Sequence, residues 1–360
     1  MKYLLLLLGF LIACSSDNNS TEEIVDDMQP METLYFPPIN SSEWQTTTIS
    51  EQNWNESALP ELTTFLSETN TEAFIILKDG KIVVEEYYNG ASNDDFQPWN
   101  SAGKTLTAFT VGIAENEGLL SIENMSSQFL GEGWTSMSLA QENTIQLFHQ
   151  LTMTSGGDYT VDNTACYDPE CLRYLSDPGT FWYYHNAFYT LLQPVLDAAT
   201  PTGFTTYFSE KVKDKIGMNG AWITLGYNNV YFSSARSMAR FGLLNLNKGA
   251  WKEEQLIDAS YFEAMTNTSQ ELNKSYGYLW WLNGKESYRL PQSTAQFSGT
   301  LIPNAPSDLI AGLGKDDQKL YVIPSKNMVV VRMGGNGGSE LLGPSGYDNN
   351  LWGKISALIN

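Results

Sequence analysis

The sequence predicts an α+β fold in which one antiparallel sheet is built from both chain ends and flanked by helices. Two β-rich runs lie within residues 72–90, and further β-rich runs lie between residues 275 and 334. The region between them, approximately 119–270, carries mostly helical signals. Strands at both ends of a helical region pack most simply as one sheet with that region inserted.

The first predicted elements are a helix, a hairpin and a second helix. Residues 59–70 have the apolar spacing of an amphipathic helix. Residues 72–90 contain two β-rich runs around Asp79-Gly80, a pair typical of tight hairpin turns. A longer helix is predicted to begin within 97–112, QPWNSAGKTLTAFTVG, where a proline and an asparagine precede apolar residues at helical spacing.

The later elements complete the predicted sheet and cover it. Residues 235–249 give the clearest helical pattern, and residues 188–199 give another that Pro194 should kink. Four β-rich runs follow, at 275–284, 308–314, 319–324 and 327–334. Residues 349–360 are predicted to form a closing helix.

The N-terminus reads as a targeting segment. Residues 1–13 pair one lysine with an apolar stretch too short to span a bilayer, which indicates a signal peptide. The tetrad LIAC that ends at Cys14 resembles the lipobox of bacterial lipoproteins, in which the cysteine carries the lipid. The alternative is a plain secretory signal with an incidental cysteine. Residues 14–45 are predicted to be a tether, residues 46–360 the folded domain, and the location the bacterial cell envelope, periplasmic or outer-surface.

The net charge bears on nucleic-acid binding, and the cysteines bear on disulfide or metal binding. The formal net charge is -21 without a basic cluster, which argues against nucleic acid. Cys166 and Cys171 lie close together in an exported chain, so a local disulfide is expected. A zinc half-site is the alternative, but the chain offers only His149 and His185 as further soft ligands. No metal or organic cofactor is predicted.

Ser101 and Lys104 are the candidate nucleophile and base. A serine hydroxyl needs an adjacent base before it can attack, and a lysine serves when burial lowers its pKa. At positions i and i+3 of a helix the two side chains share one face. The helix N-terminus adds backbone N–H groups that suit a developing oxyanion. The alternative is that Lys104 is an ordinary solvated residue in a first helical turn.

The chain from residue 60 to 360 resembles the β-lactamase-related serine hydrolases, which include penicillin-binding peptidases, class C β-lactamases, esterases and amide hydrolases. The resemblance extends from Ser-x-x-Lys to several stretches in the family's order, namely HQLTMTSGG (149–157), WYYHNAFYTLL (182–192), SYGYLWWL (275–282) and KLYVIPSKNMVVVRMG (319–334). It implies a β-lactamase/transpeptidase-like fold and a Ser-Lys-Tyr mechanism.

The family's second motif, Tyr-x-Asn, occurs four times in this chain, and position favours Tyr184-His185-Asn186. The resemblance implies that Tyr184 exchanges protons with Ser101 and the leaving group, while Lys104 lowers its pKa. It also implies that Asn186 holds Lys104 and binds substrate. The alternative is that Tyr184 is one more buried aromatic residue.

The third motif departs from the family. Members carry Lys-Thr-Gly, Lys-Ser-Gly or His-x-Gly, and none of these occurs here. Gly312-Leu313-Gly314 is the best-placed equivalent, whereas FSGT (297–300) lies too far upstream. Gly312 would then replace the family's charge, although Lys315 could restore it. The backbone N–H groups of Ser101 and Lys315 are the expected oxyanion hole.

These observations favour an exported serine hydrolase that cleaves an ester or amide through an acyl-enzyme on Ser101. We expect poor hydrolysis of β-lactams and D-alanyl peptides and better activity on neutral esters or amides, because the charge that binds a carboxylate is missing at Gly312 unless Lys315 restores it. A non-catalytic protein that binds a ligand or peptidoglycan on the same scaffold is the alternative, and the altered third motif favours it.

Overall fold

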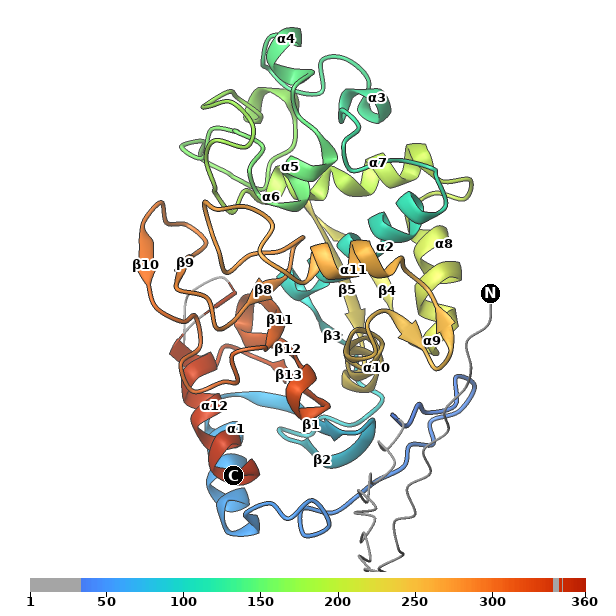
Figure 1. Cartoon of the computed structure of the whole chain (residues 1–360), viewed down its shortest axis with the longest axis vertical. Coiled ribbons are helices and arrows are strands. Elements are labelled where there is room, and N and C mark those ends of the chain that lie inside the picture. Colours follow the sequence, from blue (N-terminus) through green and yellow to red (C-terminus); the bar gives the residue numbers. More distant parts are fainter. Residues whose placement is uncertain (1–33, 339–342, 345) are drawn as a thin grey trace, which may run out of the picture. The chain divides into compact units, whose positions relative to one another are not determined.

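A six-stranded antiparallel sheet forms the centre of the protein, with strand order β2-β1-β13-β12-β11-β8. The computed structural model describes residues 34–338, 343–344 and 346–360 (Figure 1). The sheet strands are β1 (Thr71–Lys78), β2 (Lys81–Tyr87), β8 (Trp281–Leu282), β11 (Ile310–Gly314), β12 (Gln318–Ile323) and β13 (Met328–Gly334). The predicted sheet from both chain ends is therefore confirmed, because β1 pairs directly with β13.

The β1–β2 hairpin turns where the sequence predicts it. Asp79 and Gly80 have φ angles of 50° and 81°, the left-handed conformation that a two-residue hairpin turn requires. A Cβ at Gly80 would lie 1.9 Å from the carbonyl oxygen of Tyr35, so this position also needs glycine for space. The predicted run at 275–284 is mostly loop, since only Trp281–Leu282 joins the sheet.

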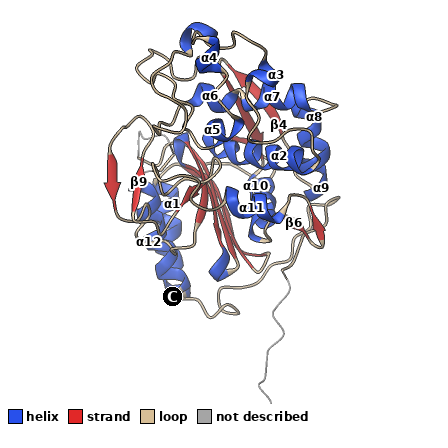
Figure 2. Cartoon of the chain, turned by 45° about the horizontal axis from the view of Figure 1, so that its top comes forward, coloured by secondary structure: helices blue, strands red, loops and turns tan. Residues whose placement is uncertain are grey.

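Helices cover the two faces of the sheet (Figure 2). On one face lies α10 (Ala235–Leu246), where Gly242 lets the helix approach Leu320 and Val329 closely. On the other lie α1 (Leu59–Glu68) and α12 (Gly346–Ile359), and the Trp352 ring of α12 packs edge-on against Tyr321. Adjacent residues of a strand point to opposite faces, which is why Leu320 and Tyr321 contact different helices.

The predicted helical insert contains helices, long loops and a small sheet that the sequence analysis missed. It follows α2 (Lys104–Asn116) and contains, besides α10, the helices α3 (Ser127–Leu130), α4 (Leu139–Glu142), α5 (Leu147–Leu151), α6 (Asn186–Thr190), α7 (Leu192–Ala199), α8 (Phe204–Phe208), α9 (Asp214–Ile216) and α11 (Ala259–Met265). The predicted helix at 188–199 is divided into α6 and α7, since Pro194 cannot donate a backbone hydrogen bond to the preceding turn.

The missed sheet has the order β3-β5-β4, from β3 (Gln97–Pro98), β4 (Ala221–Leu225) and β5 (Asn228–Ser233). It joins the segment before Ser101 to a hairpin more than a hundred residues later, because Pro98 pairs with Phe232. Two short hairpins complete the strands, β6 (Ala250–Trp251) with β7 (Glu254–Gln255), and β9 (Ser287–Arg289) with β10 (Gln296–Ser298).

The last part of the predicted tether lies against the folded body. Arg240 donates hydrogen bonds to the carbonyls of Pro38 and Ser41, and Arg236 donates to that of Ser42. Residues 1–33, with the predicted signal peptide and Cys14, lie outside the described part of the chain. Within that part, none of the helices has the length and apolar character to cross a membrane.

Candidate active site

Ser101 lies on a 3₁₀ turn, Asn100–Gly103, that leads directly into α2. The preceding residue, Asn100, has a φ of 48°, and its side-chain amide donates to the carbonyl oxygen of Lys315 at 2.9 Å. The Nζ atom of Lys104 donates to Ser101 Oγ at 2.9 Å. The structure therefore brings the predicted nucleophile and base into direct contact.

Lys104 is buried at 3% exposure, and its amine lies among aromatic rings. Nζ is 4.0 Å from the ring centroid of Tyr189 and 4.9 Å from that of Tyr184. No ion pair to Lys104 occurs among residues 34–338, 343–344 and 346–360. Burial removes water from the ammonium and lowers the pKa of Lys104 from 10.5 to about 7. A neutral amine is then accessible near neutral pH and can accept the Ser101 proton.

Tyr184 lies beside the nucleophile, and its ring stacks on Trp281 at a centroid distance of 5.8 Å. Burial raises the pKa of Tyr184 well above its ordinary value, while a hydrogen bond with Ser101 acts in the opposite direction and is outweighed. The expectation that Lys104 lowers this pKa stays a prediction. A tyrosine whose pKa is raised keeps its proton near neutral pH, so the Tyr184 hydroxyl can donate a hydrogen bond.

Asn186 begins α6 and lines the same cavity as Ser101. Its Oδ1 atom is buried and has no hydrogen-bond partner among the described residues. The expected hydrogen bond from Lys104 to this oxygen is not formed, and Lys104 Nζ donates to Ser101 Oγ. A buried acceptor without a partner is costly, so a substrate N–H that reaches Asn186 would gain a strong interaction.

Strand β11 packs against the Ser101 turn because of its glycines. A Cβ at Gly314 would lie 2.5 Å from the Trp99 carbonyl oxygen and 3.1 Å from the Ala102 nitrogen. At Gly312 it would lie 3.2 Å from the Thr105 methyl group. Gly314 therefore allows the close approach that brings the Lys315 backbone beside Ser101. The FSGT segment instead lies on the exposed strand β10.

We expect Gly314→Ala to lower kcat for an activated ester by at least about tenfold, because a displacement near 1 Å at a reacting centre costs up to about 10²-fold. The added methyl group meets backbone atoms, which cannot move without moving the Ser101 turn. Gly312→Ala is the milder comparison and should stay within about threefold of the parent, since its Cβ would lie 3.2 Å from the Thr105 methyl group and no closer than 3.4 Å to a backbone atom, the Ala102 carbonyl oxygen. Equal kcat values for both variants would contradict this role of Gly314.

The cavity beside Ser101 has a volume of about 320 Å³. Its lining is rich in amides and contains no carboxylate among the described residues; it consists of Asn100, Ser101, Lys104, Ala165, Asn186, Tyr189, Leu225, Asn228, Asn229, Val230 and Lys315. The sequence analysis missed Tyr189 and the β4–β5 hairpin. Asn228 and Asn229 belong to another occurrence of the Tyr-x-Asn pattern, Tyr227-Asn228-Asn229, and this match could have pointed to the hairpin as part of the site.

Cys166 and Cys171 form the predicted disulfide, and Ala165 beside it lines the cavity. The two histidines make local contacts instead of activating Ser101. His149 Nδ1 accepts from the Gln146 backbone, and His185 Nε2 lies 3.4 Å from the Asp158 carbonyl oxygen. Within the described ranges, no three His, Cys, Asp or Glu side chains are grouped as metal ligands.

The comparisons with known proteins agree with this geometry. The chain is 24% identical over 315 residues to 6-aminohexanoate-dimer hydrolase of Paenarthrobacter ureafaciens, which covers 76% of this chain and 75% of that protein. A candidate 6-aminohexanoate-dimer hydrolase from Bacillus anthracis has a TM-score of 0.67 at 19% identity, covering 89% of this chain and 88% of its own. A penicillin-binding protein from Bacillus halodurans has a TM-score of 0.59 at 16% identity, covering 82% and 99%. The Beta-lactamase family model matches residues 68–334, and the chain therefore belongs to the Beta-lactamase family.

Proposed function

We propose that this protein is a serine hydrolase that cleaves an ester or amide through an acyl-enzyme on Ser101. One observation carries the proposal. The Ser101 hydroxyl contacts a buried lysine amine at 2.9 Å, and burial lowers the pKa of Lys104 to about 7. A base whose pKa lies near the working pH is best suited to general-base catalysis.

In the acylation step, Lys104 Nζ takes the proton of Ser101, and Oγ attacks the carbonyl carbon of the substrate. The backbone N–H groups of Ser101 and Lys315 stabilise the oxyanion that forms. Collapse of this intermediate breaks the bond to the leaving group. Tyr184 donates its O–H proton to the departing atom, and the proton on Lys104 replaces it.

Deacylation uses the same groups in reverse. A water molecule gives its proton to Lys104 and attacks the acyl carbon, and Ser101 recovers a proton as it leaves. The unpartnered Asn186 Oδ1 accepts a hydrogen bond from an N–H of the substrate, which favours an amide over an ester of similar shape. The amide-hydrolase name of the relative from Paenarthrobacter ureafaciens supports the same class of substrate.

Poor β-lactam and D-alanyl peptide hydrolysis remains our expectation, because the buried strand position Gly312 carries no charge. The exposed Lys315 lines the cavity and offers a cation elsewhere. We expect wild type to prefer a flexible carboxylate substrate over its methyl ester by roughly twofold to fivefold in kcat/KM, the range for exposed ion pairs. Lys315→Ala should abolish that preference. A preference for the methyl ester in wild type would instead restore the neutral-substrate expectation.

We further propose that the protein is exported and anchored through a lipid on Cys14. The signal-like segment and the polar residues after it support this location. The full-length protein processed in a bacterial host should partition into the detergent phase, and Cys14→Ser should partition into the aqueous phase. Aqueous partitioning of the unaltered protein would count against the anchor.

Labelling with a fluorescent phosphonate separates this function from that of a non-catalytic binding protein. A phosphonate reacts covalently with an activated serine and not with a passive binding cleft. We expect the label on Ser101 in the wild-type protein, located by peptide mapping. A protein that stays unlabelled and yet binds peptidoglycan fragments would favour the binding alternative.

A further inference from the structure

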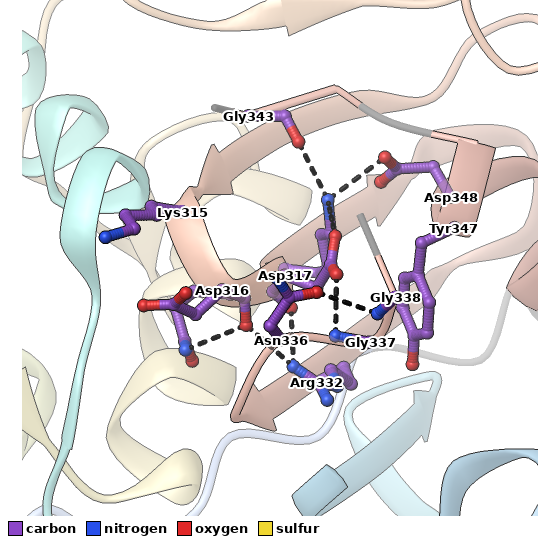
Figure 3. Close-up of polar contacts among 12 residues, drawn as sticks. Lys315, Asp316, Asp317, Arg332, Asn336, Gly337, Gly338, Gly343, Tyr347 and Asp348 are labelled. Carbon is purple, nitrogen blue, oxygen red and sulfur yellow. Dashed lines mark hydrogen bonds and ion pairs between the residues drawn. The ribbon is translucent and has the colours of Figure 1, made fainter. Parts of the chain in front are cut away.

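The turn between β11 and β12 places Lys315 at the cavity, and its backbone is unusual. Asp316 and Asp317 follow Lys315 with φ angles of 59° and 54°. Two successive non-glycine residues in the left-handed region are unfavourable, so the surrounding structure must hold them there. Figure 3 shows the Lys315 side chain directed away from the polar groups that surround Asp317.

Arg332 holds the carbonyl groups of this turn from β13 (Figure 3). Its fully buried guanidinium donates from Nη1 to the Asp316 and Asp317 carbonyl oxygens at 2.9 and 3.1 Å. Its Nε and Nη2 atoms donate to the Thr71 hydroxyl and the Thr69 carbonyl, which ties the turn to the start of β1. One guanidinium therefore fixes two consecutive carbonyls of the turn through Nη1 and anchors them to β1 through its other nitrogens.

Lys319 holds the Asp317 side chain from β12. Its amine is fully buried and lies 3.1 Å from Asp317 Oδ1, 3.0 Å from Asp348 Oδ2 and 2.9 Å from the Gly343 carbonyl oxygen. All three ammonium donors are thus used. Asp317 Oδ2 also accepts from the Gly337 backbone at 2.9 Å. Two buried cations and two buried carboxylates balance in charge around the turn.

The other end of the turn meets the nucleophile. The Lys315 carbonyl accepts from the Asn100 side chain at 2.9 Å, and Asn100 precedes Ser101. A rigid chain of contacts therefore runs from Arg332 and Lys319 through Asp316 and Asp317 to the Ser101 turn. We propose that Arg332 and Lys319 are positioning residues that fix the Lys315 N–H for oxyanion binding, an inference that rests on the proposed hydrolase function.

Arg332→Lys tests this directly, because it keeps the charge, but an ammonium has only three donors and cannot make all four hydrogen bonds that anchor the turn to β1. With protein concentration set by phosphonate titration of active sites, we expect kcat to fall by at least about tenfold, toward the about 10²–10³-fold loss of an oxyanion donor. KM should stay within about twofold. Asp317→Asn keeps the shape of the side chain and should also lower kcat, by a smaller factor than Arg332→Lys.

Leu62→Ala, at a buried position of α1, is the control for a purely structural effect, since it should lower thermal stability and leave kcat per titrated site unchanged. If Arg332→Lys and Asp317→Asn behave like Leu62→Ala, the positioning role is refuted while the hydrolase function stands. If the arginine variant does not fold, the asparagine variant decides alone. A wild-type protein without labelling or turnover would refute the hydrolase function itself.

Discussion

Ser101→Ala is expected to reduce hydrolysis of an activated ester by about 10⁴–10⁶-fold, the range seen when a serine nucleophile is removed. The neighbouring Lys104 and Tyr184 are poor substitutes for the nucleophile, because each is buried at 3% exposure. The substitution removes one atom from a half-buried turn, so folding should be unchanged. Intact mass after rapid acid quenching should detect the acyl-enzyme only in the parent.

Ser155→Ala is a suitable control for that experiment. Ser155 is buried, its hydroxyl has no hydrogen-bond partner among the described residues, and it does not line the cavity. Its loss should leave kcat within about twofold of the parent. A covalent acyl adduct that persists in Ser101→Ala would place the nucleophile elsewhere and reject the assignment.

Lys104→Met and Tyr184→Phe should each lower kcat by about 10²–10⁴-fold, the usual contribution of a general acid or base. Methionine fills the buried lysine channel without an amine, and phenylalanine keeps the ring that stacks on Trp281. Because both residues serve one proton transfer, the double variant should be little worse than the weaker single variant. Losses that multiply would show that Tyr184 acts independently of Lys104.

Much of the fold followed from patterns that are local in the chain. The Asp79-Gly80 turn and the β-rich runs near both ends were enough to predict the central sheet. The β4–β5 hairpin was missed although AWITL and NNVYFS carry β-rich residues around Gly226. Most of β4 is exposed, so it lacks the alternation of apolar and polar residues that marks a half-buried strand.

In the candidate site, too, local spacing predicted some features and only the folded chain determined others. The spacing of Ser101 and Lys104 was sufficient to predict their contact, because i and i+3 positions meet on any helical turn. The lowered pKa of Lys104 was expected only on the condition that the residue is buried, and the raised pKa of Tyr184 was not predictable, because burial depends on how completely distant segments exclude water. The role of Tyr189 was not predictable for the same reason, since only the folded chain places its ring against the Lys104 amine.

The contacts of Asn186 and Arg332 were beyond sequence analysis for another reason. A polar residue at a motif position can choose among several partners, and spacing does not select one. Asn186 leaves its Oδ1 without a partner beside the cavity, and Arg332 turns inward to the β11–β12 turn. The contacts of Arg332 depend on long-range pairing of β11, β12 and β13.

The pH dependence of the phosphonylation rate tests the central claim, that a neutral buried Lys104 activates Ser101. Protonated Lys104 cannot accept the serine proton, so the rate should fall about tenfold for each pH unit below the pKa and level off above it. Since burial lowers the pKa of Lys104 to about 7, the wild-type midpoint should lie near pH 7, and Lys104→Met should lack this limb. A wild-type rate that still rises between pH 8 and 10, as expected for an ordinary lysine, would contradict the account.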